Sequence, residues 1–211
     1  MYIPKRFHED NWPRIRQVIE DNSFATMVSC NEGIPTATHL PLHLVESTDG
    51  AAKLQGHMAK ANQHWQLFGD KGRSLAIFTG PHSYVSPRWY DHVNVPTWNY
   101  VAVHVYGKVR LVTTAEGMRE LMKGLVDRYE GDSGADRKYT LERLPKDFLE
   151  SQMRGIVGFE MFVDEIQASF KLSQNRDEKN YENVIAELSK SDDQQSQAVA
   201  QLMANRRCLK P

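Results

Sequence analysis

The sequence predicts an α+β fold that is mainly β, with an antiparallel barrel, flanking helices and a helical C-terminal tail. Two observations support this prediction. Strand-like segments in the first half are separated by tight turns and not by regular helices, which favours an antiparallel barrel over a doubly wound sheet. From about Asn175 onward the pattern becomes helical. We therefore expect a barrel domain over residues 1–172 and a helical extension over residues 173–211.

The predicted strands are runs of β-branched and aromatic residues between turns. In the longest run, residues 97–113, four valines (Val101, Val103, Val105 and Val109) alternate with polar or aromatic neighbours. This period of two is typical of a sheet with two different faces. The other strands are expected at residues 24–30, 35–47, 51–58, 74–80, 82–86 and 156–172, with turns at 31–34 and 47–50.

The predicted helices follow apolar residues at helical spacing. Residues 9–22 form the first, where Asp10 or Asn11 can cap the helix and Pro13 suits its first turn. Its apolar face would consist of Trp12, Ile15, Val18 and Ile19. Further helical segments are expected at 62–70, 113–131, 140–155 with a break near Pro145, 177–191 and 194–207, and a loop at 131–138.

Local signals mark the ends of the helix at 113–131. Thr113 and Glu116 have the spacing of a capping box, and Gly131 can end the helix. In the C-terminal tail, Val184, Ile185 and Leu188 share one face.

Composition limits the classes of protein that fit this chain. The 211 residues carry 26 positive and 27 negative charges, a net charge of −1, without a block of like charges. This balance gives no overall electrostatic footprint for nucleic acid, although a local basic patch can still exist. Cys30 and Cys208 lack metal-ligand spacing, and no run of 18 apolar residues occurs. We expect a soluble, cytoplasmic protein that does not enter a membrane.

The eight histidines all lie in the first half of the chain, which indicates a polar site built by the β-region; ordinary hydrogen-bonding histidines are the alternative. A metal site is not expected. His39 and His43 are four residues apart, a separation of about 13 Å on one strand, which is too far for one ion. The sequence also lacks the nucleophile-elbow, P-loop and dinucleotide-binding patterns, so we assign no catalytic residue.

The run "GHMAKANQHW", residues 56–65, combines donors suited to an anion. His57, Lys60 and Asn62 can all donate hydrogen bonds, and Gly56 would let the backbone approach a ligand closely. A helix starting at Asn62 would add free backbone N–H groups. The alternative is a strand that ends in a helix cap, with Lys60 solvated.

Two further runs place aromatic rings beside amide and hydroxyl groups. They are "FTGPHSYVSPRWY", residues 78–90, and "VPTWNY", residues 95–100. Such surroundings suit a flat ring system that forms hydrogen bonds. Aromatic core packing with turn residues is the alternative for each run. Together with residues 56–65, the two runs favour a ligand that is both planar and phosphorylated.

Several uncommon sequence motifs in this chain resemble motifs of the PaiB family. They occur in the same order from Met1 to about residue 190: "MYIPKRF" (1–7), "HLPL" (39–42), "GHMAKAN" (56–62), "FTGPHSYVSPRWY" (78–90), "VPTWNY" (95–100), "VHVYGKVRL" (103–111) and "KLSQNR" (171–176). The resemblance implies a split β-barrel of the FMN-binding type, similar to pyridoxamine-phosphate oxidases and flavin reductases. It also implies FMN as cofactor and a homodimer with FMN at the subunit interface.

The resemblance further implies a negative transcriptional regulator of sporulation and of degradative-enzyme production. A flavin-binding regulator without catalysis is favoured over an enzyme. The alternatives are an FMN-dependent oxidoreductase of the pyridoxamine-phosphate-oxidase and flavin-reductase class, and a flavin or haem carrier without turnover. DNA binding would be direct or through another protein. For direct contact the candidates are Arg206 and Arg207, although a basic C-terminus can also be a solvated end.

The candidate FMN contacts fall into three groups. On the phosphate side we expect His57, Lys60 and Asn62. For the ring and ribityl chain we expect Thr38, His39, Ser86, Thr97, Trp98 and Asn99. In "KLSQNR", Lys171, Gln174, Asn175 and Arg176 could reach the same cavity, or the segment could be a polar turn capped by Asn175.

Overall fold

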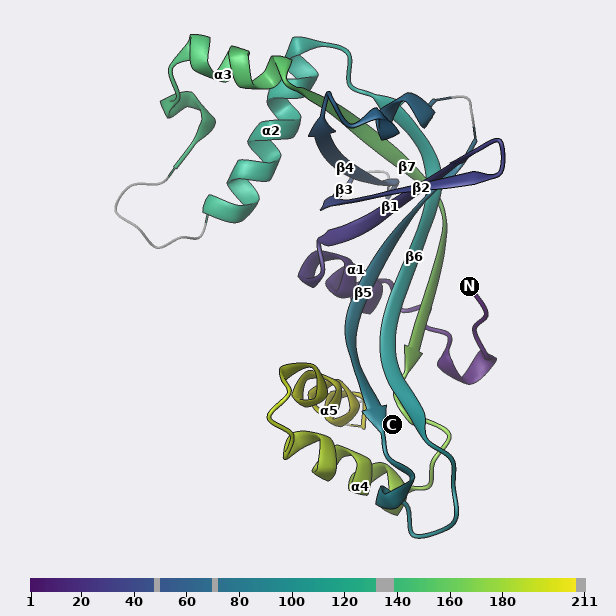
Figure 1. The fold of residues 1–211 in the computed structure, drawn as a ribbon. Coiled ribbons are helices and arrows are strands. Elements are labelled where there is room, and N and C mark those ends of the chain that lie inside the picture. Colours follow the sequence, from purple (N-terminus) through teal and green to yellow (C-terminus); the bar gives the residue numbers. More distant parts are fainter. Residues whose placement is uncertain (48–49, 70–71, 132–138, 208–211) are drawn as a thin grey trace. The chain divides into compact units, whose positions relative to one another are not determined.

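A computed structural model describes residues 1–47, 50–69, 72–131 and 139–207 of the chain (Figure 1). Most of the loop expected at 131–138, the middle of the turn at 47–50, and Cys208 lie outside the described residues. The side chain of Arg207 is likewise not described.

Within these ranges, seven strands form one antiparallel sheet in the order β2-β1-β5-β6-β7-β4-β3. The strands are β1 (Phe24–Asn31), β2 (Ile34–Pro41), β3 (His43–Glu46), β4 (Ala52–Ala59), β5 (Ser74–Val85), β6 (Thr97–Leu111) and β7 (Ile156–Lys171). The prediction of an antiparallel, mainly β architecture is confirmed. Two strand boundaries differ from expectation. The run at 35–47 divides at Leu42, whose N–H donates to the carbonyl of Ser23, and residues 74–85 form one continuous strand.

Five α-helices occur in the described part of the chain, together with short 3₁₀ turns. The helices are α1 (Trp12–Asp21), α2 (Ala115–Glu130), α3 (Lys146–Arg154), α4 (Glu178–Ser189) and α5 (Gln194–Arg207). The 3₁₀ turns are η1 (Lys5–Phe7), η2 (Gln63–Leu67), η3 (Pro87–Trp89) and η4 (Leu141–Arg143). All the predicted helical segments are present, and the one at 62–70 is the 3₁₀ turn η2.

The N-caps correct two local predictions. Asn11 caps α1 as expected, because its side chain accepts from the N–H of Arg14. Helix α2 is capped by Thr114, whose hydroxyl accepts from Gly117, so the box based on Thr113 is wrong. Helix α4 is capped by Asp177 and not by Asn175. In each case a side-chain oxygen satisfies a backbone N–H that has no partner within the helix.

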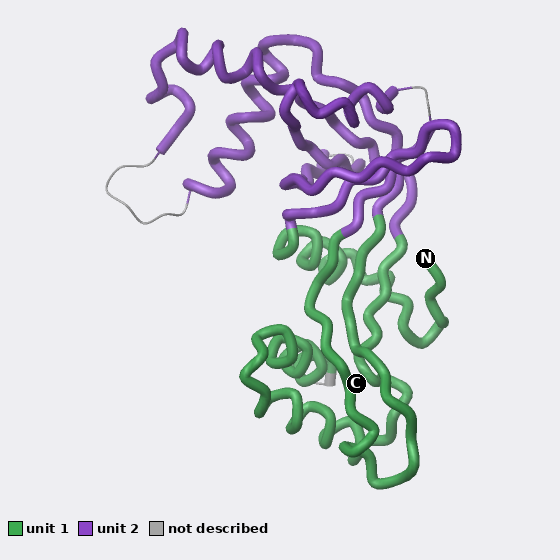
Figure 2. Tube along the Cα trace, in the orientation of Figure 1, with its two compact units in different colours: residues 1–22, 78–104, 167–211 green, residues 23–77, 105–166 purple. Residues whose placement is uncertain are grey.

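The chain divides into two compact units (Figure 2). Unit 1 contains residues 1–22, 78–104 and 167–211, and unit 2 contains residues 23–77 and 105–166. One boundary lies between α1 and β1, and the other three lie within β5, β6 and β7. The domain boundary expected after residue 172 stays a prediction, because compactness does not define what folds independently.

Each unit has its own buried apolar residues. In unit 1, Ile15, Val18 and Ile19 of α1 are buried, as the helical pattern predicted. The tail contributes Val184, Leu188 and Met203. In unit 2 the largest fully buried side chains include Met27, Leu54, Leu121, Phe159 and Met161. The four valines of β6 at positions 101, 103, 105 and 109 are all buried, which confirms the two-faced alternation.

Three glycines in unit 2 allow strands and helix to approach residues 158–162 of β7. A Cβ at Gly56 would lie 2.8 Å from side-chain atoms of both Leu42 and Phe159. A Cβ at Gly107 would overlap the carbonyl of Phe162, and one at Gly158 would overlap Met118 of α2. Core packing therefore requires a glycine at position 56.

We predict opposite effects for two Gly→Ala substitutions in unit 2. Gly107→Ala should lower the free energy of unfolding by about 1–3 kcal/mol, because the new methyl group meets backbone that cannot move aside easily. Gly124→Ala is the matched control in α2. It has open space around its Cβ position and should raise the free energy of unfolding by about 0.5–1 kcal/mol. Urea unfolding of both variants tests this, and equal stabilities would contradict it.

Candidate functional site

A cluster of hydrogen-bonded side chains in unit 2 joins β2 to the turn after β4. The amide of Asn62 donates to the hydroxyl of Thr38 at 3.2 Å, and this hydroxyl lies 2.8 Å from Nδ1 of His64. The carbonyl oxygen of Asn62 accepts from the backbone N–H of His64 at 3.0 Å, which caps η2. Of the expected contacts in this unit, the structure therefore brings Thr38 and Asn62 together.

Lys60 lies at the end of β4, two residues before Asn62. Its backbone N–H donates to the carbonyl of Gly155 at 2.8 Å, and its own carbonyl accepts from the indole N–H of Trp65 at 3.0 Å. The backbone is thus fixed, while the side chain is exposed. Among the described residues no carboxylate forms an ion pair with the Lys60 ammonium. Within the described part of the chain it is thus a positive charge without an ion-pair partner, close in sequence to the Thr38–Asn62–His64 cluster.

The side chains of His57 and His39 do not lie on the same sheet face as Thr38. His57 is paired in register with Gly158, and directly opposed residues share a face of the sheet. Since a Cβ at Gly158 would meet Met118 and Leu121, His57 lies on the face covered by α2. His39 follows Thr38 on β2 and so points to the opposite face, where it is exposed and Nδ1 lies 3.0 Å from the hydroxyl of Thr26.

His64 lies in the run at residues 56–65 but was not among the expected FMN contacts. It is 2% exposed, and its ring lies 5.3 Å from that of Phe68. Burial lowers the pKa of His64, so the neutral imidazole is favoured. Within the described structure its Nε2 atom is buried without a hydrogen-bond partner. The signal in the sequence was its position two residues after the capping Asn62.

Unit 1 contains a polar cavity of about 300 Å³. It is lined by Tyr2, Pro4, Arg6, Phe7, Thr97, Asn99, Lys171, Ser173, Asn175 and Arg176. The ammonium of Lys171 donates to the hydroxyl of Thr97 at 2.6 Å. Five of the residues expected to contact FMN thus share one cavity: Thr97, Asn99, Lys171, Asn175 and Arg176. We call it the unit 1 cavity.

A fully buried contact holds one wall of the unit 1 cavity. The amide nitrogen of Asn99 donates to the hydroxyl of Ser173 at 2.9 Å, and this hydroxyl lies 3.2 Å from the carbonyl oxygen of Asn99. Ser173 has φ = 60°, a left-handed conformation that non-glycine residues seldom adopt. The pair with Asn99 helps to hold Ser173 in this conformation, which turns the chain after β7.

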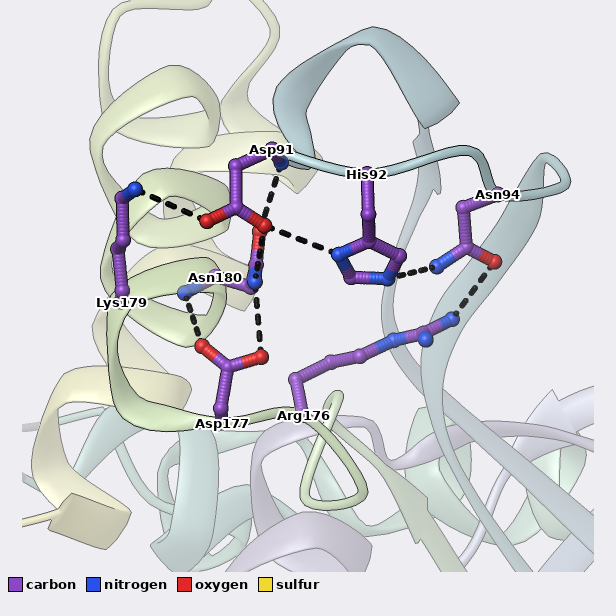
Figure 3. Close-up of polar contacts among 7 residues, drawn as sticks. All are labelled: Asp91, His92, Asn94, Arg176, Asp177, Lys179 and Asn180. Atoms are coloured by element: carbon purple, nitrogen blue, oxygen red, sulfur yellow. Dashed lines mark hydrogen bonds and ion pairs between the residues drawn. The ribbon is translucent and has the colours of Figure 1, made fainter.

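Arg176 is held by contacts on two sides, of which Figure 3 shows the one with Asn94. Its guanidinium donates to Asn94 at 3.3 Å and lies 4.5 Å from the ring centroid of Tyr90. Hydrogen bonds from His92, Lys179 and Asn180 lower the pKa of neighbouring Asp91. The charged groups of Asp91 and Lys179 therefore neutralise each other and leave Arg176 without a carboxylate partner among the described residues.

The remaining expected residues have other surroundings. Ser86 caps η3, and the side chain of Gln174 bonds the backbone at Leu172 and Phe170. Trp98 is 53% exposed, on the opposite face of β6 from Asn99. Arg206 forms an ion pair of 3.1 Å with Glu9. These contacts do not test the expected roles in binding FMN or DNA, which stay predictions.

The solved structures with a similar fold include flavin proteins. The flavocytochrome Anf3 from Azotobacter vinelandii is 13% identical, with a TM-score of 0.62 over 86% of this chain and 78% of that one. The FAD and haem binding protein from Mycobacterium smegmatis is 15% identical, with a TM-score of 0.57 over 85% of this chain and 79% of that one. The fold is that of the flavin-binding split barrel, α+β and mainly β, as expected.

Sequence comparison gives the family. A family described as "Putative FMN-binding domain" matches residues 1–165. The "Protease synthase and sporulation protein PAI 2" of Bacillus subtilis (strain 168) is 41% identical over 206 residues, which cover 98% of each chain. The chain belongs to this FMN-binding family and is PaiB-like, and FMN is its cofactor. No helix within the described residues is long and apolar enough to span a membrane.

The groups present in unit 2 fit FMN. Lys60 supplies a positive charge without a carboxylate partner in the described structure, and the Asn62 amide has a second N–H beyond the one that Thr38 accepts. Within the described residues the buried Nε2 of His64 has no hydrogen-bond partner, which fits a polar site that a ligand completes. A phosphate needs this combination of cation and neutral donors.

We predict that acid weakens unit 2 through His64. Burial lowers the pKa of folded His64 below its usual value of about 6.5. The unfolded chain therefore binds more protons, so stability is complete above about pH 6.5 and is lost as the pH falls through the lowered pKa. His57 in the same unit, whose pKa burial also lowers, contributes with the same sign, and so does His104 in unit 1. His64→Gln should make the loss smaller.

The measurement is urea unfolding of wild type and His64→Gln at a series of pH values between about 5 and 8. His39→Gln is the matched control, because it removes an exposed imidazole from the same unit. An acid loss that is the same in His64→Gln as in the wild type would contradict the account.

Proposed function

We propose that this protein is an FMN-binding negative regulator of transcription, acting on genes for sporulation and degradative enzymes. The observation that carries the proposal is the extent of the similarity to the Bacillus subtilis protein. It covers 98% of both chains, whereas the FMN-binding family match ends at residue 165. The similarity therefore includes most of the C-terminal region, with helices α4 and α5, which FMN binding alone does not explain.

In this proposal the Thr38–Asn62–His64 cluster and Lys60 hold the phosphate side of FMN. Lys60 supplies the charge, Asn62 donates from its free amide N–H, and His64 positions Thr38 and Asn62. FMN supplies redox chemistry or a ligand-sensitive surface when it is bound. We assign no catalytic acid or base to this cluster.

We further propose that the protein acts as a homodimer. In unit 1 several large apolar side chains are exposed: Tyr84, Val93, Val95 and Trp98. The rings of Tyr84 and Trp98 lie 6.1 Å apart in an edge-on contact and form one exposed aromatic surface. A second copy would cover this surface, and two-fold pairs are the commonest oligomers. Sedimentation velocity at micromolar concentration measures the state directly, and a monomer would overturn this part of the proposal.

Lys60→Ala tests the phosphate assignment. The substitution removes a charge-assisted hydrogen bond, so the affinity for FMN should fall by about tenfold to a hundredfold. Riboflavin lacks the phosphate, and its affinity should barely change. Quenching of flavin fluorescence measures both ligands. Lys108→Ala is the matched control, because Lys108 is an exposed lysine of the same unit.

The ratio of FMN to riboflavin affinity decides between the outcomes. Equal losses for the two flavins in Lys60→Ala would mean general damage to the binding site. If neither affinity changes, Lys60 is solvated and the phosphate binds elsewhere, which would refute the assignment.

Regulation is tested by a gel shift with the DNA upstream of the protein's own gene. If Arg206 and Arg207 contact phosphates, changing both to Ala should weaken binding at all sequences alike. It should also reduce the slope of log K against log salt by about 2. Arg206 and Arg14 both pair with Glu9, so Arg14→Ala is the control for loss of this ion pair.

The outcomes separate the functions. Equal weakening by Arg14→Ala and by the double variant would mean that the ion pair with Glu9, not DNA contact, is responsible. The absence of any shift with wild-type protein would contradict direct regulation. Reduction of bound FMN by NAD(P)H in that case would favour the oxidoreductase.

A further inference from the structure

The unit 1 cavity brings together two motifs from opposite ends of the chain. Tyr2, Pro4, Arg6 and Phe7 come from "MYIPKRF", whereas Lys171, Ser173, Asn175 and Arg176 come from "KLSQNR". The N-terminal motif is held against β7, because His8 forms a bridge with Ser169 and the N–H of Glu9 donates to Ala168 at 3.1 Å. The Thr38–Asn62–His64 cluster and Lys60, which we propose to hold the FMN phosphate, belong to neither motif.

The charge of the cavity is unbalanced. Its lining includes Arg6, Lys171 and Arg176 but no carboxylate, and none of these three forms an ion pair among the residues that the structure describes. Lys171 is half-buried and donates to a neutral hydroxyl, that of Thr97. Burial and the nearby charge of Arg176 lower the pKa of Lys171. Three cations around about 300 Å³ disfavour one another until an anion enters.

The remaining lining suits an oriented ligand. Thr97, Asn99, Ser173 and Asn175 are neutral groups that can donate or accept hydrogen bonds. Ser173 is held at positive φ, which costs free energy, and its partner Asn99 is fully buried, so this part of the wall is fixed. Arg176 is already oriented by Asn94 and Tyr90, so little side-chain freedom is lost when a ligand binds.

We propose that the unit 1 cavity binds a small organic phosphate monoester as a second ligand, in addition to FMN. This assignment replaces the expected contacts of the cavity residues with FMN, which the Thr38–Asn62–His64 cluster and Lys60 hold in the proposed function. A phosphate monoester carries about −1.5 to −2 charges near pH 7 and matches three cations better than a carboxylate does. Two of these cations, Lys171 and Arg176, lie outside residues 1–165, the part that matches the FMN-binding family. This inference rests on the proposed function in one respect: FMN must bind outside the unit 1 cavity.

The experiment uses phenyl phosphate and benzoate, which share a ring and differ in charge. Each is titrated calorimetrically into FMN-saturated protein. Phenyl phosphate should bind in a 1:1 ratio and at least about tenfold more tightly than benzoate. Lys171→Met and Arg176→Gln should each weaken phenyl phosphate by about tenfold to a hundredfold and leave the affinity for FMN within about twofold.

Lys190→Ala is the matched control in the same unit, because Lys190 is exposed and paired with Glu187. It should change neither affinity. The proposal is overturned if phenyl phosphate does not bind wild type at millimolar concentration, or if benzoate binds as tightly. It is also overturned if Lys171→Met or Arg176→Gln lowers the affinity for FMN but not for riboflavin, because the cavity would then hold the FMN phosphate.

A failure of FMN to bind at all is a separate result. It would refute the proposed function, and the same titrations of flavin-free protein would still decide whether the unit 1 cavity takes phenyl phosphate.

Discussion

Close packing around residues 158–162 of β7 is the constraint on which unit 2 depends. Gly56 leaves room for Phe159, Gly107 leaves room for the backbone at Phe162, and Gly158 leaves room for α2. The pairing of β4 with β7 continues to Ala59 and Ile156, and the next hydrogen bond joins Lys60 to Gly155. The chain therefore leaves β4 at a fixed position, where Lys60 and then Asn62 follow. This packing therefore fixes the positions of Lys60 and of Asn62 in the Thr38–Asn62–His64 cluster.

In unit 1 a comparable role falls to Glu9, which is 5% exposed and pairs with both Arg14 and Arg206. Burial alone would raise the pKa of Glu9, but the N–H of Asn11 and the charge of Arg14 lower it overall. An ionised carboxylate is thus retained in a nearly closed position. This carboxylate joins the N-terminal segment to α1 and α5, while the backbone at His8 and Glu9 pairs with Ser169 and Ala168 of β7. As a result Arg6 lines the same cavity as Lys171.

Much of the fold could be predicted because its signals are local. The alternating valines of β6 and the apolar face of α1 need only their own sequence spacing. The caps were harder, since Thr113 and Thr114 are adjacent and either can cap. The choice depends on where β6 ends against β7, and there the N–H of Val112 donates to Gly158 at 2.9 Å. That hydrogen bond joins residues far apart in the sequence, so the local sequence around Thr113 and Thr114 does not reveal it.

The sites were predicted less completely for the same reason. Strand alternation alone could have shown that Thr38 and His39 face opposite ways. The partner of His64 becomes visible only when β2 lies beside η2. The unit 1 cavity is least accessible to sequence reasoning, because Arg6 and Lys171 lie at opposite ends of the chain. Their shared cavity follows from the pairing of the N-terminal segment with β7.

The central claim is that this chain holds FMN through its phosphate. The most direct test is the absorbance spectrum of protein purified from cells, followed by release and identification of the chromophore. The account predicts a flavin spectrum and released FMN in a ratio near one per chain. Release of riboflavin or haem, or a protein without any chromophore that also fails to bind added FMN, would contradict it.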